Sequence, residues 1–143
     1  MALKLTLKPN ERIVVNGCVL RNSDRRHVLT VESHADIVRG HDLLEADGEA
    51  TPVRQAYFLI QTALIRSETR DKIVPLIQKQ LADLATCFGG EPLTKVFEAA
   101  SYVSVRDYYK AMRALRPVLR HEEELLAYAA SRAGAPLTPE AAS

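Results

Sequence analysis

Apolar and polar residues alternate strictly over residues 3–8, which read LKLTLK. A period of two predicts a half-buried strand, with the leucines toward a core and Lys4, Thr6 and Lys8 on a basic outer face. Residues 8–11, KPNE, predict a tight turn, because proline presets the first turn position and asparagine tolerates the second. The chain is therefore expected to reverse direction soon after its first strand.

Further short strands are predicted before residue 40. Residues 12–15 are rich in β-branched side chains, which favour a strand. Asn16-Gly17 is the strongest hairpin signal, because a type I′ turn needs positive φ at both positions. Residues 18–21 would return from that turn, 27–31 would follow a second turn, and 35–39 would add a last strand. The pattern is that of an antiparallel meander.

The pattern changes after residue 50. Residues 40–52 contain acids, two glycines and a proline and are interpreted as a linker. Thr51-Pro52 is an N-cap followed by proline at the first helical position. Helices are predicted over residues 53–65, 67–88, 92–103 and 106–130, with Pro75 and Pro117 disturbing the second and fourth.

Strands that come first and helices that come later favour an α+β fold. We expect an N-terminal antiparallel β-meander (residues 1–50) packed on a C-terminal bundle of about four helices (51–130), with a disordered tail (131–143). A few short strands are not stable alone, so the sheet has to pack on the helices or on a second subunit. A homodimer or a higher homo-oligomer is therefore expected.

Composition narrows the class of protein. The 143 residues, 47% of them hydrophobic, can fold as one domain, and the net charge of +1 excludes a grossly basic chain but not local patches. Cys18 and Cys87 lie in hydrophobic, core-like contexts without a CxxC motif, which fits a reducing compartment. No apolar run is long enough for a signal peptide or a membrane span, so a cytoplasmic protein without membrane contact is expected.

Residues 106–120 place charges of a single sign on one side of a predicted helix. At about 100° per residue, the apolar arc opposes a cationic arc that also contains Tyr109. The cations of that arc are Arg106, Lys110, Arg113, Arg116 and Arg120. Like charges one turn apart repel, so this face suits a phosphate backbone with stackable bases. The alternative is an ordinary wet surface, with Glu122–Glu124 pairing with the arginines or with a neighbouring helix.

The first thirty residues are also basic, with six cations and two acids. Such a face fits single-stranded RNA, although lysines on an edge strand also protect against aggregation. The candidate RNA-binding residues of both regions are Lys4, Lys8, Arg12, Arg25, Arg26, Arg106, Tyr109, Lys110, Arg113, Arg116 and Arg120.

No catalytic constellation accompanies these surfaces. The sequence contains no nucleophile elbow, P-loop or dinucleotide fingerprint. His27, His34 and His41 are spaced by seven, but a strand and a loop between them would not bring them to one face. We expect no enzyme, no metal and no cofactor.

Four separate blocks carry a family resemblance. LKLTLKPNERIVVNGCVLRN, TPVRQAYFLIQTALI, LADLATCF and DYYKAMRALRPVL, within residues 2–126, together resemble the FlbT family of flagellin regulators from alphaproteobacteria. The resemblance implies an RNA-binding post-transcriptional regulator that binds the 5′ untranslated region of flagellin mRNA and promotes its decay or represses translation. It also implies a companion, FlaF, with opposing effects. Some family members activate, so the sign of regulation stays open.

A protein-interaction module is the second hypothesis. The helical half could hold flagellin or FlaF in a groove, with indirect effects on mRNA. The apolar helix 53–65 and the acids Glu122–Glu124 favour that alternative.

A weaker likeness concerns the first thirty residues alone, which look like the start of the small CsrA-type RNA regulators. Those proteins are strand-exchanged dimers. The likeness implies a sheet assembled across a dimer whose outer strand contacts RNA.

Overall fold

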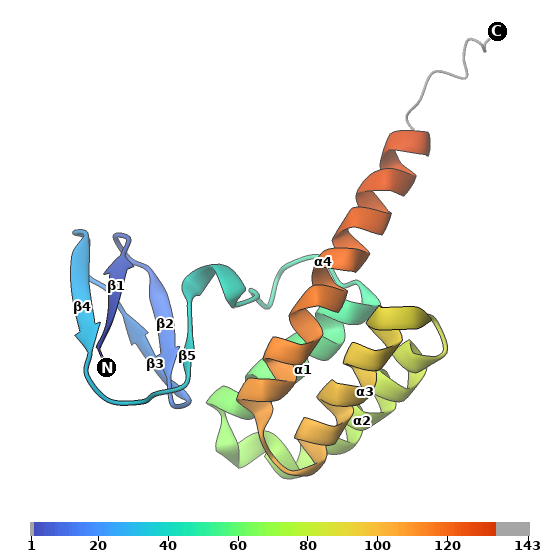
Figure 1. Ribbon diagram of the computed structural model, residues 1–143, viewed down its shortest axis with the longest axis horizontal. Helices are drawn as coiled ribbons and strands as arrows, with labels where there is room; N and C mark the ends of the chain where they lie inside the picture. Colours follow the sequence, from blue (N-terminus) through green and yellow to red (C-terminus); the bar gives the residue numbers. More distant parts are fainter. Residues whose placement is uncertain (1, 134–143) are drawn as a thin grey trace, which may run out of the picture.

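The computed structural model describes residues 2–133, with strands gathered at one end and helices at the other (Figure 1). The strands are β1 (Leu3–Leu7), β2 (Arg12–Val15), β3 (Cys18–Arg21), β4 (His27–Val31) and β5 (Ile37–Val38). The helices are η1 (Gly40–Asp42), α1 (Pro52–Ile65), η2 (Ser67–Thr69), α2 (Arg70–Ala85), α3 (Gly90–Ser104) and α4 (Tyr108–Ala133). The predicted α+β fold class is confirmed.

The strands form two small antiparallel sheets, β1–β4 and β3–β2–β5. The turn after β1 forms as predicted, with Asn10 at a φ of 61°. It carries the chain into the other sheet, so β1 does not pair with β2. The Asn10 amide donates to the carbonyl of Ser23 (2.7 Å), and the Asn22 amide donates to the carbonyl of Glu11 (2.8 Å). These bonds hold the end of β1 beside the segment that leads into β4. Strand β4 is the hydrogen-bonded partner of β1.

The Asn16-Gly17 hairpin between β2 and β3 is confirmed, with positive φ at both residues. A Cβ atom on Gly17 would lie 3.0 Å from the carbonyl oxygen of Leu64. The turn therefore lies against the end of α1, where a larger residue would be both strained and crowded.

The bundle begins where the sequence predicts. The Thr51 side chain accepts a hydrogen bond from the Arg54 amide (3.3 Å), which confirms the N-cap. Helix α4 packs on α1 and α3, and α2 packs on the same two helices. Pro75 and Pro117 lie inside α2 and α4 without ending them.

Two apolar clusters differ greatly in size. The larger one takes side chains from all four α-helices and includes Val14 of β2 and Val38 of β5. The smaller one has only Leu5, Leu7 and Ile13 as buried members. The strand half therefore packs on the helices mainly through β2 and β5.

Two local expectations are wrong. Cys18 and Cys87 are exposed, because β3 is an edge strand and Cys87 lies past the end of α2. Helix α4 starts at Tyr108, since Arg106 adopts a φ of 63° after α3 and the Asp107 carboxylate accepts from the Lys110 amide (3.1 Å).

The predicted tail from residue 131 begins inside α4, and residues 134–143 lie outside the described part of the chain. Among the helices of residues 2–133, none combines the length and hydropathy that crossing a bilayer takes.

Candidate nucleic-acid interface

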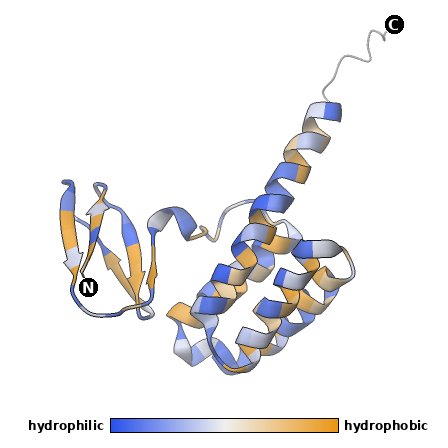
Figure 2. Cartoon of the chain, viewed as in Figure 1, coloured by the Kyte–Doolittle hydropathy of each residue, from blue (hydrophilic) through white to orange (hydrophobic). Residues whose placement is uncertain are grey.

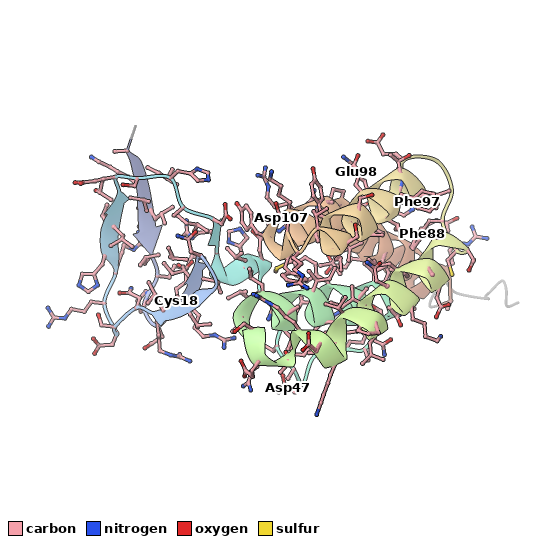
Figure 3. The ribbon with its side chains drawn as sticks, turned by 90° about the horizontal axis from the view of Figure 1, so that it is seen from below. Cys18, Asp47, Phe88, Phe97, Glu98 and Asp107 are labelled. Atoms are coloured by element: carbon pink, nitrogen blue, oxygen red, sulfur yellow. The ribbon has the colours of Figure 1, made fainter. Side chains whose placement is uncertain are left out.

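The predicted cationic face of α4 is only partly present. Lys110, Arg113 and Arg120 are exposed on the helix, whereas Arg106 is exposed in the loop before it. The Arg113 guanidinium lies 5.8 Å from the centroid of the half-buried Tyr109 ring. This pair offers a charge and part of an aromatic face at the surface, as stacking on bases requires. Figure 3 shows Asp107, which caps the helix, at the end of the bundle nearest the strands.

Arg116 points inward, contrary to the expectation that it lies on the solvent arc. Its side chain is 19% exposed, and its Nη1 lies 3.4 Å from the Asp42 carboxylate. Its Nε donates to the Tyr57 hydroxyl (3.1 Å), which donates to the Asp42 carbonyl (2.6 Å). Burial raises the pKa of Tyr57, and the hydrogen bond from Arg116 opposes that rise. A helical wheel misses this because the linker η1 covers that side of α4.

Two of the three acids after this stretch, Glu122 and Glu123, contact the start of α1, as the expected pairing with a neighbouring helix requires. Glu122 is buried, and its carboxylate accepts from the Val53 amide (3.0 Å) and from the Thr51 hydroxyl. Glu123 lies 3.5 Å from the Arg54 guanidinium. A carboxylate at a helix N-terminus satisfies free amides and complements the helix dipole. Glu122 and Glu123 thus serve the fold, which weakens the case for an acidic docking site.

A cleft of about 620 Å³ lies between the turn after β1, the β2–β3 sheet and η1. Four cations and two acids line it: Lys8, Arg12, Arg21, Arg39, Glu11 and Glu45. Lys8 and Arg12 were among the predicted RNA-binding residues, whereas Arg21 and Arg39 were not. No residue of α4 lines this cleft.

The arginines of β2 and β3 are arranged unfavourably for the protein alone. Arg12 and Arg21 are directly opposite partners in the antiparallel pair, where like charges destabilise. The Glu45 carboxylate lies 2.5 Å from the Arg12 guanidinium and offsets its positive charge. Arg21 and Lys8 form no ion pair within residues 2–133. The six charged side chains of the cleft therefore leave an excess of two positive charges.

A fixed ion pair forms one wall of the cleft. The Arg39 Nε lies 3.1 Å from the Glu11 carboxylate, whose side chain is 10% exposed. The hydrogen bond from Arg39 and backbone bonds from Lys8 and Gly40 outweigh burial and lower the pKa of Glu11 to about 2. A Cβ at Gly40 would lie 2.9 Å from the Arg12 carbonyl oxygen, so the wall leaves no room there. Sequence reasoning missed Arg39 because its partner, Glu11, is twenty-eight residues away.

The remaining predicted cations of the strand half lie outside this cleft. Lys4 is exposed on β1, opposite Thr30, and Arg25 and Arg26 are exposed in the connection between β3 and β4. The structure therefore brings Lys8 and Arg12 together and leaves Lys4, Arg25 and Arg26 elsewhere on the surface.

The histidines form pairs and no larger cluster in the described chain. His34 lies 3.6 Å from Asp36, and His41 lies 3.4 Å from Asp42. Within residues 2–133, no three His, Cys, Asp or Glu side chains gather as a metal ion would require.

Comparison with known proteins gives the family. Residues 3–126 match the family described as "Flagellar protein FlbT". The chain belongs to the FlbT family. It is 31% identical over 132 residues to the "Flagellum biosynthesis repressor protein FlbT" of Caulobacter vibrioides (strain ATCC 19089 / CIP 103742 / CB 15), covering 92% of this chain and 94% of that protein.

A second FlbT relative, the "Probable flagellum biosynthesis repressor protein FlbT" of Rhodopseudomonas palustris (strain TIE-1), is 35% identical over 130 residues. The match covers 88% of this chain and 98% of that protein. FlbT is not a known enzyme family, and no solved structure matches this chain.

Proposed function

We propose that this FlbT chain is an RNA-binding regulator that represses flagellin synthesis after transcription. It would bind the 5′ untranslated region of flagellin mRNA and repress translation or promote decay. The names of its relatives, which call them repressors of flagellum biosynthesis, support the regulatory part of this proposal.

The observation that carries the RNA-binding part is the cleft beside Pro9. Arg12 and Arg21 face each other across β2 and β3, and Lys8 and Arg21 have no acid partner within residues 2–133. A phosphodiester bound there would offset the like-charge repulsion, because arginine forks match phosphate oxygens. Phosphate contacts of this kind position a nucleic acid, and base contacts made elsewhere specify it.

The exposed start of α4 is the second candidate contact. Lys110 and Arg113 supply charge, and Tyr109 supplies part of an aromatic face. Arg116 is not a suitable probe of this surface, because reversing its charge would break its contacts with Asp42 and Tyr57. Lys110 and Arg113 are the pair to change.

Three double variants with the same change in net charge test the proposal. Lys8→Glu/Arg21→Glu alters the cleft, Lys110→Glu/Arg113→Glu alters α4, and Lys72→Glu/Lys79→Glu is the control on the exposed side of α2. Binding to the flagellin leader RNA is measured by fluorescence anisotropy across a salt series. The cleft variant should bind at least about tenfold more weakly, and its log–log salt slope should become shallower by about 1.4, for two lost single-strand phosphate contacts.

The control separates a specific site from general charge. If the α2 variant loses as much affinity as the cleft variant, attraction is diffuse and the cleft is not the site. If the wild-type chain does not prefer the flagellin leader over an unrelated RNA of equal length at physiological salt, the proposed function itself is wrong.

A further inference from the structure

A second cavity lies between the strand half and the bundle, next to the cationic cleft of about 620 Å³. It has a volume of about 290 Å³ and is formed by β3, the segment after η1, and α1. Its large apolar lining residues are Val19, Leu44, Phe58 and Ile65. We call this cavity the apolar pocket. Arg12 and Glu45 line both the apolar pocket and the cationic cleft, so the two adjoin.

The strand register explains why the two cavities adjoin. Residues directly opposite each other in an antiparallel pair lie on the same face of the sheet. Val19 is opposite Val14, whose side chain is buried among the helices, so this face is the one toward the bundle. Arg21, opposite Arg12, lies on the same face about 7 Å further along β3. Figure 2 shows hydrophobic residues along β3, the outer strand of this sheet.

Helix α1 forms the opposite wall of the apolar pocket. Phe58, Thr62 and Ile65 follow one another at steps of four and three, which places them on one face of the helix. The turn at Gly17 lies against the carbonyl of Leu64 at the end of this helix. That contact holds the start of β3 beside α1, with the pocket between them.

Buried hydrogen bonds fix the remaining wall. The Leu44 amide donates to Oε1 of Gln61 (2.9 Å), and Nε2 of Gln61 donates to the Leu44 carbonyl (3.0 Å). The Gln61 side chain is buried, and both ends of its amide are used in this way. The segment after η1 is therefore anchored on α1 before any ligand arrives, as in the preformed sites that bind small ligands.

Two apolar side chains of the pocket remain outside the cores of the protein. Val19 is 41% exposed, and Phe58 is half-buried. Within residues 2–133, neither of them packs on either apolar cluster. Leu44 and Ile65, in contrast, pack on the larger cluster. Val19 and Phe58 thus leave apolar and aromatic surface available to a ligand.

We propose that the apolar pocket takes one unpaired nucleobase of the RNA whose backbone the cationic cleft binds. This inference rests on the proposed function and adds a base contact to it. A strand with phosphates at Lys8 and Arg21 reaches the pocket past Arg12, which lines both cavities. Single-stranded RNA is recognised through bases that leave their stack and lie on aromatic side chains, and Phe58 supplies such a ring.

The polar part of the lining suits the edge of a base. The Glu45 carboxylate is an acceptor for N–H groups, and the exposed Arg66 supplies donors. Arg66 forms no ion pair within residues 2–133. An apolar side chain of a protein partner would fill the pocket but would gain nothing from the adjoining cations. The charge beside the pocket therefore favours a nucleotide as its occupant.

Two matched double variants test the walls of the pocket. Val19→Ala/Phe58→Ala should bind the flagellin leader RNA at least about fivefold more weakly, because a base loses its apolar contacts. Its log–log salt slope should equal that of the wild type, because no phosphate contact is lost. Val28→Ala/Phe97→Ala removes the same two kinds of side chain where they are 62% and 57% exposed. This control should bind as the wild type does.

A set of synthetic leader RNAs, each lacking the base at one unpaired position, tests the occupant. One of these RNAs should bind the wild type at least about fivefold more weakly than the intact leader. The same RNA should cost the Val19→Ala/Phe58→Ala variant no further affinity, because a protein wall and the base that contacts it are coupled. Circular dichroism and thermal unfolding check that each variant is folded at the assay temperature.

Several results would overturn the proposal. They are additive losses at every position, a control as defective as the pocket variant, a shallower salt slope in the pocket variant, or a pocket variant that binds as the wild type does. A chain that prefers the leader without this coupling retains the proposed function and loses only the base pocket. A chain that shows the coupling equally in unrelated RNA retains the pocket and loses the proposed preference for flagellin mRNA. A chain that binds no RNA loses both.

Discussion

The two halves of the molecule are held together by different means. The helical half has a continuous apolar core that includes fully buried side chains such as Tyr57, Met112 and Leu115. The strand half buries only Leu5, Leu7 and Ile13 in its own cluster. A helix bundle with that core should be stable by itself, whereas two small sheets whose own cluster has three buried members should not.

Polar contacts compensate in the strand half. The Asn22 side-chain amide donates to the carbonyls of Lys8 and Arg25, each at 2.8 Å, and Glu11 pairs with Arg39. Apolar residues such as Val28, 62% exposed, remain at the surface. The cleft lies in the strand half, which we expect to be the less stable one. The geometry of the cleft therefore depends on a few hydrogen bonds and one ion pair.

The largest expected effects contrast the two cores. Leu115→Ala should destabilise the protein by about 2 to 5 kcal/mol, because it opens a cavity in a fully buried site. Ile13→Ala should instead weaken mainly the strands, because few of their contacts reach the bundle. Hydrogen exchange in urea measures both halves residue by residue. If Ile13→Ala exposes the helix amides as much as Leu115→Ala does, the halves unfold together and the contrast is wrong.

The ion pair of the strand half gives an intermediate effect that depends on pH. The folded-state pKa of Glu11 is about 2 and its ordinary value is 4.5, so its stabilising contribution is complete above pH 4.5 and is lost as the pH falls toward 2. At neutral pH that contribution is at most about 3 kcal/mol. Glu11→Gln should lower stability at pH 7 and flatten the acid limb of the unfolding curve.

The matched control for this titration is Glu45→Gln. Its carboxylate also contacts an arginine, Arg12, but its side chain is 67% exposed. Exposed pairs contribute about 0 to 1 kcal/mol, so this variant should keep the wild-type acid limb. An acid limb that is equally steep in wild type and Glu11→Gln would show that the pair does not stabilise the strands.

The smallest of these effects concerns the junction of α1 and α4. Glu122→Ala should cost about 2 kcal/mol, because the Val53 amide and the Thr51 hydroxyl lose their acceptor in a buried place. Thermal unfolding measures the loss. Glu123→Ala, whose side chain is 54% exposed, should change stability by less than about 0.5 kcal/mol. Equal effects of the two changes would mean that burial of Glu122 does not matter.

Local signals in the sequence predicted much of this structure. Alternation over residues 3–8, the Asn16-Gly17 turn and the Thr51 cap each act within a few residues, and each is found as expected. The pairing of the strands was harder to predict, because alternation indicates a strand but does not identify the strand that pairs with it. The β1–β4 pairing is fixed by hydrogen bonds between segments a dozen or more residues apart, such as Asn10 and Ser23.

The candidate site shows the same limit. Exposure of Lys110 and Arg113 follows from helical spacing, which is local. The inward position of Arg116 depends on Asp42, and the place of Arg39 in the cleft depends on Glu11. Charge counts therefore located the cationic regions, while distant acids decided which cations remain free to meet a ligand.

The bond between Thr51 and Glu122 also has a consequence for the newly made chain. The two residues are 71 positions apart, so α1 is synthesised long before the carboxylate that completes its first turn. At about 5 to 20 residues per second, that interval lasts about 4 to 14 seconds. Until Glu122 is made, the Val53 amide has only water as its acceptor, while Thr51 can already cap the Arg54 amide. A truncated chain that ends before residue 122 would lack this carboxylate, and the start of α1 would stay less well fixed.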